Sequence, residues 1–298
     1  MELIEFNLDN VPHLKDVALC LGFFDGIHLG HKAIINQAIK TGKKTAVLSF
    51  YTPPSYVIGR KDTLRSLTSV DDKADILEKM GVDYLLIMPF DLGIKNMTKD
   101  DFINDVLLKI EPSELFCGED YRFGKEALGT PQYLKNRFKV NIVPLLNIDG
   151  HKFSSRAIRQ AIYDGRISDA NRFLGHPYRI GGLIKEGNHL GTSLGFPTAN
   201  MDLDFPYCIP SNGVYIGYAY VLDKKYKCLI SVGTHPTLKE LDAAIIEVYI
   251  FDFNQIIYGD FLFIEFIDKI RDMKKFDSKE ELIKQIRLDK KEAEKRLK

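Results

Sequence analysis

Apolar and polar positions in the first half of the chain follow two alternating patterns. Short, continuous apolar runs, typical of strands covered on both faces, occur at residues 17–24, 45–50, 84–88, 114–118 and 140–145. Between them lie segments with apolar residues at helical spacing, such as Ile34, Ile35, Ala38 and Ile39. Strands that alternate with helices predict a parallel sheet with helices on both faces. Ligands bind such sheets at the carboxyl ends of the strands.

Capping residues mark the expected helix starts. Ser69 with Asp72, and Thr98 with Asp101, form Ser/Thr-x-x-acid starts, in which the hydroxyl accepts a backbone N–H and the acid bonds back. A proline fits the first turn of a helix, so residues 130–131, Thr-Pro, start another one. We therefore expect helices at 70–80 and 99–110, and one that begins at residue 131.

The pattern changes near residue 178. From there on, short alternating segments punctuated by glycine occupy residues 178–187, 213–222, 224–233, 243–253 and 259–270. This pattern predicts an antiparallel β domain that closes into a barrel. A last helix begins at Ser278, with Glu281 completing a capping box, and runs to the end of the chain with a charged, solvated face. We expect two domains, 1–178 and 179–298.

Composition excludes some classes of partner. The chain has 298 residues, with 41 Lys+Arg and 41 Asp+Glu, so no domain-wide basic field exists to bind nucleic acid. No apolar run approaches the roughly 20 residues that span a bilayer, and the acidic N-terminus does not resemble a signal peptide. The four cysteines form no C-x-x-C pair, which favours a reduced, cytoplasmic protein with buried thiols. Its partners are expected to be small molecules or proteins, and a weak homo-oligomer stays open.

Candidate chemistry lies at the end of the first strand, in the stretch "FFDGIHLGH". Asp25 and Gly26 can form a tight turn, and Gly30 allows a ligand close to the backbone. His28 and His31, at the start of the next helix, can face one point and hold a phosphate as N–H donors or as cations. Two alternatives stay open: histidines that only cap and pack the turn, and a zinc site that includes Asp25.

The pattern G-x-F-D-G-x-H-x-G-H resembles the phosphate-binding signature of nucleotidylyltransferases, and within them the first domain of bacterial bifunctional FAD synthetases. Residues 117–129 are similar to the family's G-x-D-F-x-F-G segment, residues 153–159 to its S-S-T-x-I-R segment, and residues 194–200 match the riboflavin-kinase motif. The resemblance implies a Rossmann-like nucleotidylyltransferase domain followed by a β-barrel riboflavin kinase domain with a terminal helix. It also implies two activities: phosphorylation of riboflavin to FMN, and adenylylation of FMN to FAD, with ATP as co-substrate of both.

The resemblance assigns residues to both sites. In the first domain it implies His28 and His31 as catalytic residues, and it implies a nucleotide- and flavin-binding set of Gly22, Phe24, Asp25, Gly30, Asp120, Ser155 and Arg159. In the second domain it implies Glu247 as general base for the ribityl 5′-hydroxyl, and Gly187, Gly191, Pro197, Thr198, Asn200 and Arg271 as binding residues.

The residues of the second domain support these roles on their own. Thr198 and Asn200 are oxygen donors two positions apart in an extended segment, so both can meet one Mg²⁺. Glu247 interrupts an apolar strand, where a carboxylate needs either a structural partner or a function. The structural alternative, a paired glutamate at the barrel rim, stays open.

The sequence departs from the family pattern at several positions. Residues 50–56 lack the histidine of the F-D-P-H-P segment, and Arg156, Lys152 and Thr192 replace Thr, Arg and Arg. Lysine keeps the charge but loses the bidentate geometry of arginine. Two rival interpretations follow: a nucleotidylyltransferase of another cofactor pathway, and a flavin-binding protein without catalysis. We nevertheless expect both activities.

Overall fold

The structure is a computed structural model that describes residues 1–59, 65–145, 147–148, 151–152, 154–186, 195–222, 224–234 and 244–298. It divides into two compact units, Met1–Ser155 and Arg156–Lys298, each of which is described by itself. The boundary of the functional domains at residue 178 stays a prediction.

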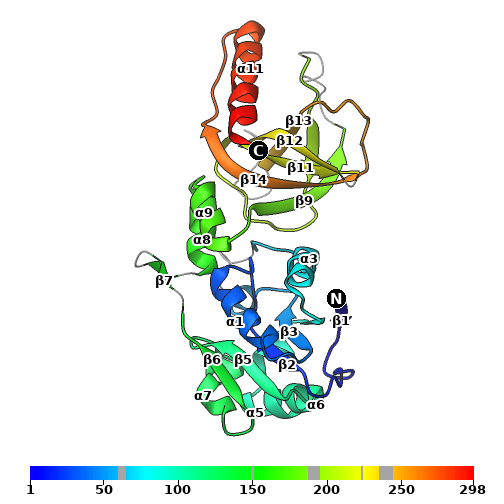
Figure 1. Cartoon of the computed structure of the whole chain (residues 1–298), viewed down its shortest axis with the longest axis vertical. Helices are drawn as coiled ribbons and strands as arrows, with labels where there is room; N and C mark the ends of the chain where they lie inside the picture. The colour runs from blue at the N-terminus through cyan, green and yellow to red at the C-terminus, as the bar shows by residue number, and fades with distance from the viewer. Residues whose placement is uncertain are drawn as a thin grey trace. The chain divides into compact units, whose positions relative to one another are not determined.

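The first unit contains a parallel sheet with the strand order β1-β4-β3-β2-β5-β6 (Figure 1). Its strands are β1 (Glu2–Glu5), β2 (Ala18–Leu21), β3 (Thr45–Phe50), β4 (Tyr84–Met88), β5 (Glu114–Gly118) and β6 (Val140–Val143). The predicted runs match β2 to β6, and the parallel sheet is confirmed. β1 was missed. The first run was predicted too long, because β2 ends at Leu21 and residues 22–24 lead into the turn at Asp25 and Gly26.

Helices cover both faces of this sheet, as predicted. One face packs α1 (Leu29–Ile39) and α3 (Val70–Met80) against Ala18, Cys20 and Val47. The opposite face packs the segment from α5 through α6 and α7 against Leu19, Leu21 and Leu48. The remaining short elements of the unit are α2 (Pro54–Val57), α4 (Leu92–Asn96), α5 (Lys99–Phe102), η2 (Ile103–Leu107), α6 (Leu108–Ile110), η3 (Lys125–Ala127), α7 (Pro131–Leu134), β7 (Asn147–Ile148) and β8 (His151–Lys152).

The capping predictions are confirmed. Ser69 and Asp72 form both bonds of a capping box at the start of α3. Thr98 accepts the N–H of Asp101 at the start of α5, and Thr130 caps α7. The predicted helix at 99–110 is interrupted by the π-helical stretch η2. These caps satisfy backbone N–H groups that the first turn of a helix leaves unbonded.

The second unit is a closed antiparallel barrel with the strand order β10-β13-β12-β11-β14-β9 (Figure 1). Its strands are β9 (Tyr178–Lys185), β10 (Ala199–Asp202), β11 (Gly213–Val221), β12 (Lys224–Thr234), β13 (Ala244–Ile250) and β14 (Phe261–Arg271). This confirms the predicted barrel. The unit also contains α8 (Ser155–Tyr163), which begins at the last residue of the first unit, α9 (Ile167–Leu174) and α11 (Lys279–Arg296).

The C-terminal half of α11 packs on the outer face of the barrel. Ala293 and Leu297 are buried there against Val214, Ile216 and Leu229. At the other end, Ser278 accepts the N–H of Glu281, as predicted. In a capping box the Glu281 carboxylate would accept the backbone N–H of Ser278. It accepts the backbone N–H of Asp277 instead, so the predicted capping box is not complete.

The four cysteines are buried free thiols, as expected. Within the described ranges, no helix combines the length and the apolar character needed to cross a membrane.

Candidate active sites

The histidine pair lies where β2 ends and α1 begins. His28 is the N-cap of α1, and its Nδ1 accepts the backbone N–H of His31 at 3.3 Å. The two imidazoles stack with a centroid separation of 3.6 Å, and the edge of Phe24 meets the His31 ring. Because Nδ1 of His28 is an acceptor, the proton of its neutral ring resides on Nε2. His28 therefore caps the helix start, which agrees with the alternative in which the histidines only cap and pack the turn.

Capping does not explain His31. Its Nδ1 is buried and has no hydrogen-bond partner among the residues that the structure describes. A buried polar atom without a partner costs free energy, and such atoms are concentrated where a ligand completes the site. This observation favours a ligand-binding role for the pair over a packing role.

Both imidazoles are neutral at physiological pH. Burial lowers the pKa of His28 to about 4, although the nearby Asp120 carboxylate opposes that shift. The pKa of His31 lies well below its ordinary value, mainly because of burial and also because His28 and Lys73 disfavour a positive charge on it. Of the two states that the sequence allowed, the structure therefore favours N–H donors over imidazolium cations.

A cavity of about 210 Å³ opens beside the pair. His28, Gly30, His31, Asp120 and Ser155 line it, together with Ser154 and residues 143–145. It lies at the carboxyl ends of β5 and β6 and at the start of α1, where free backbone N–H groups attract anions. The structure thus brings together five of the predicted site residues.

The Asp25 carboxylate holds the turn. It is buried and accepts the backbone N–H groups of Leu67 and Thr68, at 2.8 and 3.3 Å. The carbonyl oxygen of Asp25 accepts the Ser155 hydroxyl at 2.9 Å. Phe24, just before it, has a positive φ of 52°, a strained conformation for a phenylalanine. These contacts fix the path of the chain between β2 and α1.

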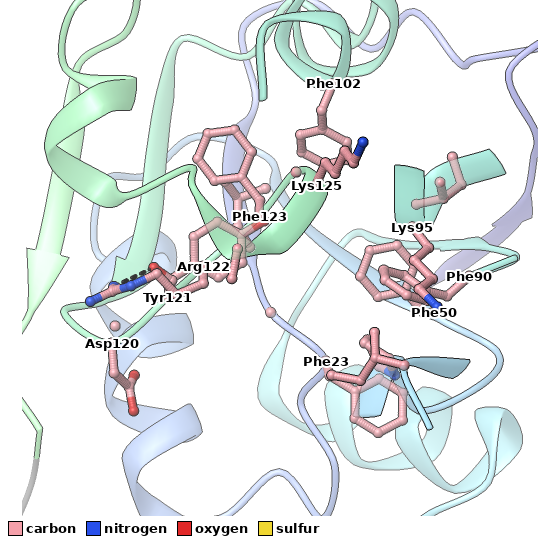
Figure 2. A pocket seen from close by; sticks show the side chains of 18 of the residues that line it. Phe23, Phe50, Phe90, Lys95, Phe102, Asp120, Tyr121, Arg122, Phe123 and Lys125 are labelled. Carbon is pink, nitrogen blue, oxygen red and sulfur yellow. Dashed lines mark hydrogen bonds between the residues drawn. The ribbon is translucent and has the colours of Figure 1, made fainter. Parts of the chain in front are cut away.

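A second, larger cavity of about 750 Å³ shares His31 and Asp120 with the first. Figure 2 shows its aromatic wall and its three cationic side chains. The aromatic residues are Phe23, Phe24, Phe50, Phe90, Phe102, Tyr121 and Phe123, and the cations are Lys95, Arg122 and Lys125. Gly22 also lines it, and a Cβ there would lie 3.0 Å from the Phe24 ring.

The resemblance predicted that the segment with Tyr121 and Phe123 lines this site, but sequence reasoning missed Phe50, Phe90 and Phe102. These three come from segments that are far apart in the chain, and nothing in their spacing groups them. One sequence signal pointed to this wall. The segment 50–56, which lacks the histidine of the family's F-D-P-H-P pattern, contributes Phe50 and Pro54 to the lining of the cavity. That departure therefore lies at the edge of the larger cavity.

Several other predicted residues lie in the second unit or outside the described part of the chain. Arg156 and Arg159 lie on α8 and belong to the second unit. The side chain of Lys152, on β8, lies outside the described part. Gly187, Gly191 and Thr192 also lie outside the described residues.

In the barrel, strand register places the predicted residues in one row. Asn200 of β10 pairs with Glu247 of β13, which pairs with Ser231 of β12. Ser231 pairs with Val214 of β11, and Val214 with Arg271 of β14. Directly opposite residues of antiparallel strands share a face. Ile246 and Val248 are buried in the barrel, so this row lies on the outer face.

Glu247 has the character of a base. Burial raises the pKa of its carboxyl group. Among the residues that the structure describes, no hydrogen bond or ion pair to this carboxylate is present. The alternative of a structurally paired glutamate at the rim therefore gains no support.

Thr198 lies two residues before Asn200 and lines a cavity of about 340 Å³. Pro197, Val248 and the segment 253–258 are also among the lining residues. Arg271, at the far end of the row, donates from Nε and Nη2 to the buried Asp289 of α11, at 2.9 and 2.8 Å. The Arg271 guanidinium therefore ties α11 to β14.

The fold and these sites define a two-domain protein: a parallel nucleotidylyltransferase-type sheet with a histidine pair, and a kinase-type barrel whose Glu247 has no partner among the described residues. Two family models match this division, FAD synthetase over residues 11–157 and riboflavin kinase over residues 174–297.

Curated relatives extend over nearly the whole chain. The bifunctional riboflavin kinase/FMN adenylyltransferase of Listeria monocytogenes is 36% identical, covering 91% of this chain and 89% of the relative. That of Bacillus subtilis is 35% identical, covering 92% and 90%. The chain therefore belongs to the bifunctional riboflavin kinase/FMN adenylyltransferase family.

A solved structure from Streptococcus pneumoniae, described as a macrolide-efflux protein, has the same fold over the full length. It covers 97% of both chains with a TM-score of 0.90 and 32% identity.

Proposed function

We propose that this chain makes FAD from riboflavin in two steps at separate sites. The barrel transfers the γ-phosphoryl group of ATP to riboflavin, and the first unit joins the resulting FMN to the adenylyl group of a second ATP. The observation that carries the proposal is the neutral histidine pair, which lines a small cavity and of which His31 also lines a large aromatic one.

In the first unit, we infer that the isoalloxazine ring of FMN occupies the aromatic cavity. Its volume of about 750 Å³ is that of a typical ligand site, and flat aromatic ligands stack favourably on phenylalanine and tyrosine. The shared residues His31 and Asp120 lie where this cavity meets the small one. The FMN phosphate at this junction would face an ATP triphosphate in the small cavity.

The chemistry then needs no protein nucleophile. An oxygen of the FMN phosphate attacks the α-phosphorus of ATP, the bond from that phosphorus to the bridging oxygen breaks, and pyrophosphate leaves. His28, His31 and Gly30 are proposed to hold the triphosphate through N–H donors, and Ser155, whose hydroxyl donates to the Asp25 carbonyl oxygen, is proposed to line the triphosphate site. Arg159 is proposed to add a positive charge.

In the barrel, Glu247 accepts the proton of the ribityl 5′-hydroxyl as that oxygen attacks the γ-phosphorus, and ADP leaves. The cavity beside Pro197 and Thr198 would receive ATP. Gly187 and Gly191 are proposed to take part in binding its phosphates. Arg271 is proposed to fix the flavin end of the site through the segment that follows it.

The barrel residues also fit a magnesium ion. Thr198 and Asn200 offer neutral oxygen donors, and the register pairs Asn200 with the Glu247 carboxylate. Thr198 and Asn200 would hold Mg²⁺, which when bound would neutralise the charge of the ATP phosphates.

The proposal is tested by incubating the chain with Mg-ATP and either riboflavin or FMN, followed by chromatography of the flavins. We expect FMN and FAD as products. His28→Ala should depress FAD formation and spare FMN formation, and Glu247→Gln should do the reverse. Flavin binding without any product would support the non-catalytic alternative, and equal loss of both activities in each variant would refute the two-site assignment.

A further inference from the structure

Lys73 is a buried cation that the proposed chemistry does not use. It lies in the first turn of α3 and is only 2% exposed, whereas lysines are almost never fully buried. Burying an ammonium group costs free energy unless other groups compensate it. The contacts of this side chain therefore indicate what it is there to hold.

Those contacts converge on Phe23. The Lys73 ammonium lies 4.0 Å from the centroid of the Phe23 ring and donates to the Ser49 hydroxyl at 3.2 Å. Ser49 in turn donates to the Phe23 carbonyl oxygen at 2.8 Å. Lys73 thus holds both the ring and, through Ser49, the backbone of the same residue. A cation–π contact is stronger in a desolvated place than at an exposed one.

Phe23 lines the aromatic cavity and lies directly before the turn that leads to the histidine pair. Its ring lines the aromatic cavity (Figure 2), and its backbone leads into the Asp25 turn that carries the histidine pair. The charge of Lys73 also lowers the pKa of His31, on α1. One buried cation therefore acts on the wall of the aromatic cavity and on the protonation of the phosphate site.

We propose that Lys73 is a positioning residue of the adenylyltransferase site, which fixes Phe23 at the wall of the flavin cavity. This inference rests on the proposed occupation of that cavity by FMN. Because the ring is held from behind by a charge, loss of the charge frees it and weakens flavin binding, while the reacting groups stay in place.

The protonation of Lys73 gives the test a signature that a packing role lacks. Burial lowers the pKa of the ammonium group to about 8, and the carboxylate of Asp25 opposes that shift. Among the described residues, the titratable groups that act on Lys73 are Asp25, in the turn after β2, and His31, on α1. Its other contacts there, Ser49 and Phe23, are neutral. Above pH 8 the charge is lost, so the KM for FMN should rise.

The experiment compares wild type, Lys73→Met and Lys79→Met between pH 7 and pH 9, with KM and kcat measured for FAD formation. Met keeps the length of the side chain without its charge, and Lys79 is an exposed lysine on the same helix. We expect Lys73→Met to raise the KM for FMN about tenfold at pH 7, with kcat within a factor of two of the wild-type value. The increase in KM that wild type shows above pH 8 should be absent in this variant. Lys79→Met should match wild type.

An unchanged KM for FMN in folded Lys73→Met, or a rise near pH 8 that persists in it, would overturn the inference. If Lys73→Met does not fold, Ser49→Ala decides, with an expected rise in KM of about threefold and no rise as the refuting result. Phe90→Ala keeps the two proposals apart. If it leaves the KM for FMN unchanged, the cavity is not the flavin site; if it raises that KM while Lys73→Met does not, only the role of Lys73 fails.

Discussion

Glu247→Gln is the most informative single substitution in the barrel, because a catalytic and a structural carboxylate respond to it in opposite ways. The glutamine keeps the size of the side chain and removes its ability to accept a proton. On the outer row, its neighbours Asn200 and Ser231 are uncharged, so the substitution breaks no ion pair among the described residues. The change therefore isolates the basicity of one group.

The expected loss is that of a general base. Removing such a group lowers the rate by about 10²–10⁴, which corresponds to roughly 2.7–5.4 kcal/mol of transition-state stabilisation. Formation of FMN from riboflavin should fall by this factor, whereas formation of FAD from supplied FMN should stay unchanged and serves as internal control. In wild type, kinase activity should fall as the pH drops through the raised pKa of Glu247, since the protonated carboxyl cannot accept a proton. The residual kinase activity of Glu247→Gln should not show this fall at low pH.

Stability gives an independent check with a defined sign. Burial raises the pKa of Glu247 in the folded state, so the folded protein binds more protons than the unfolded one between the ordinary pKa and the raised value. The free energy of unfolding therefore falls as pH rises through this window. At neutral pH, Glu247→Gln should raise the unfolding temperature of the barrel, and the gain should vanish in acid. A variant that keeps its kinase activity and unfolds at a lower temperature would refute the assignment.

Three further predictions concern other residues. Because the pKa of His28 is lowered to about 4 and that of His31 lies well below its ordinary value, FAD formation should show no acid limb near pH 6.5; a limb there in the pH–rate profile would contradict neutral imidazoles. Phe90→Ala should raise the KM for FMN about two- to tenfold, the equivalent of roughly 0.5–1.5 kcal/mol for one aromatic contact, with kinase activity as control. Asp289→Ala should lower the free energy of unfolding of the barrel by about 3–5 kcal/mol, because it leaves the Arg271 guanidinium without its buried partner; thermal melting that matches wild type would contradict this.

Much of the fold could be predicted from local pattern. Buried parallel strands are continuous apolar runs, so β3 and β4 coincide with residues 45–50 and 84–88. β1 could not be found this way, because its four residues are mostly exposed and show no such run. The end of β2 was predicted too late, since Phe23 and Phe24 are as apolar as strand residues. They are apolar because they line a cavity.

The site was predictable only where its residues are neighbours in sequence. His28 and His31 lie three positions apart on one helical turn, so their proximity follows from helix geometry. The row from Asn200 through Glu247 to Ser231 depends on strand register, which brings together residues that are distant in the chain. Lys73 carried no signal at all, because its only distinguishing property is burial, and burial appears once the fold is known.

Burial acts on the two sites in opposite directions, and this explains how one physical cause serves two reactions. In the barrel it raises the pKa of Glu247, which makes the carboxylate a stronger base. In the first unit it lowers the pKa of His28 and His31, which keeps both imidazoles as neutral N–H donors. Neutral donors orient a triphosphate but add no charge to balance it. The positive charge must then come from other groups, of which Arg159 is the one that the sequence predicts. The histidine motif accordingly sets the geometry of the site, and cations outside the motif set its electrostatics.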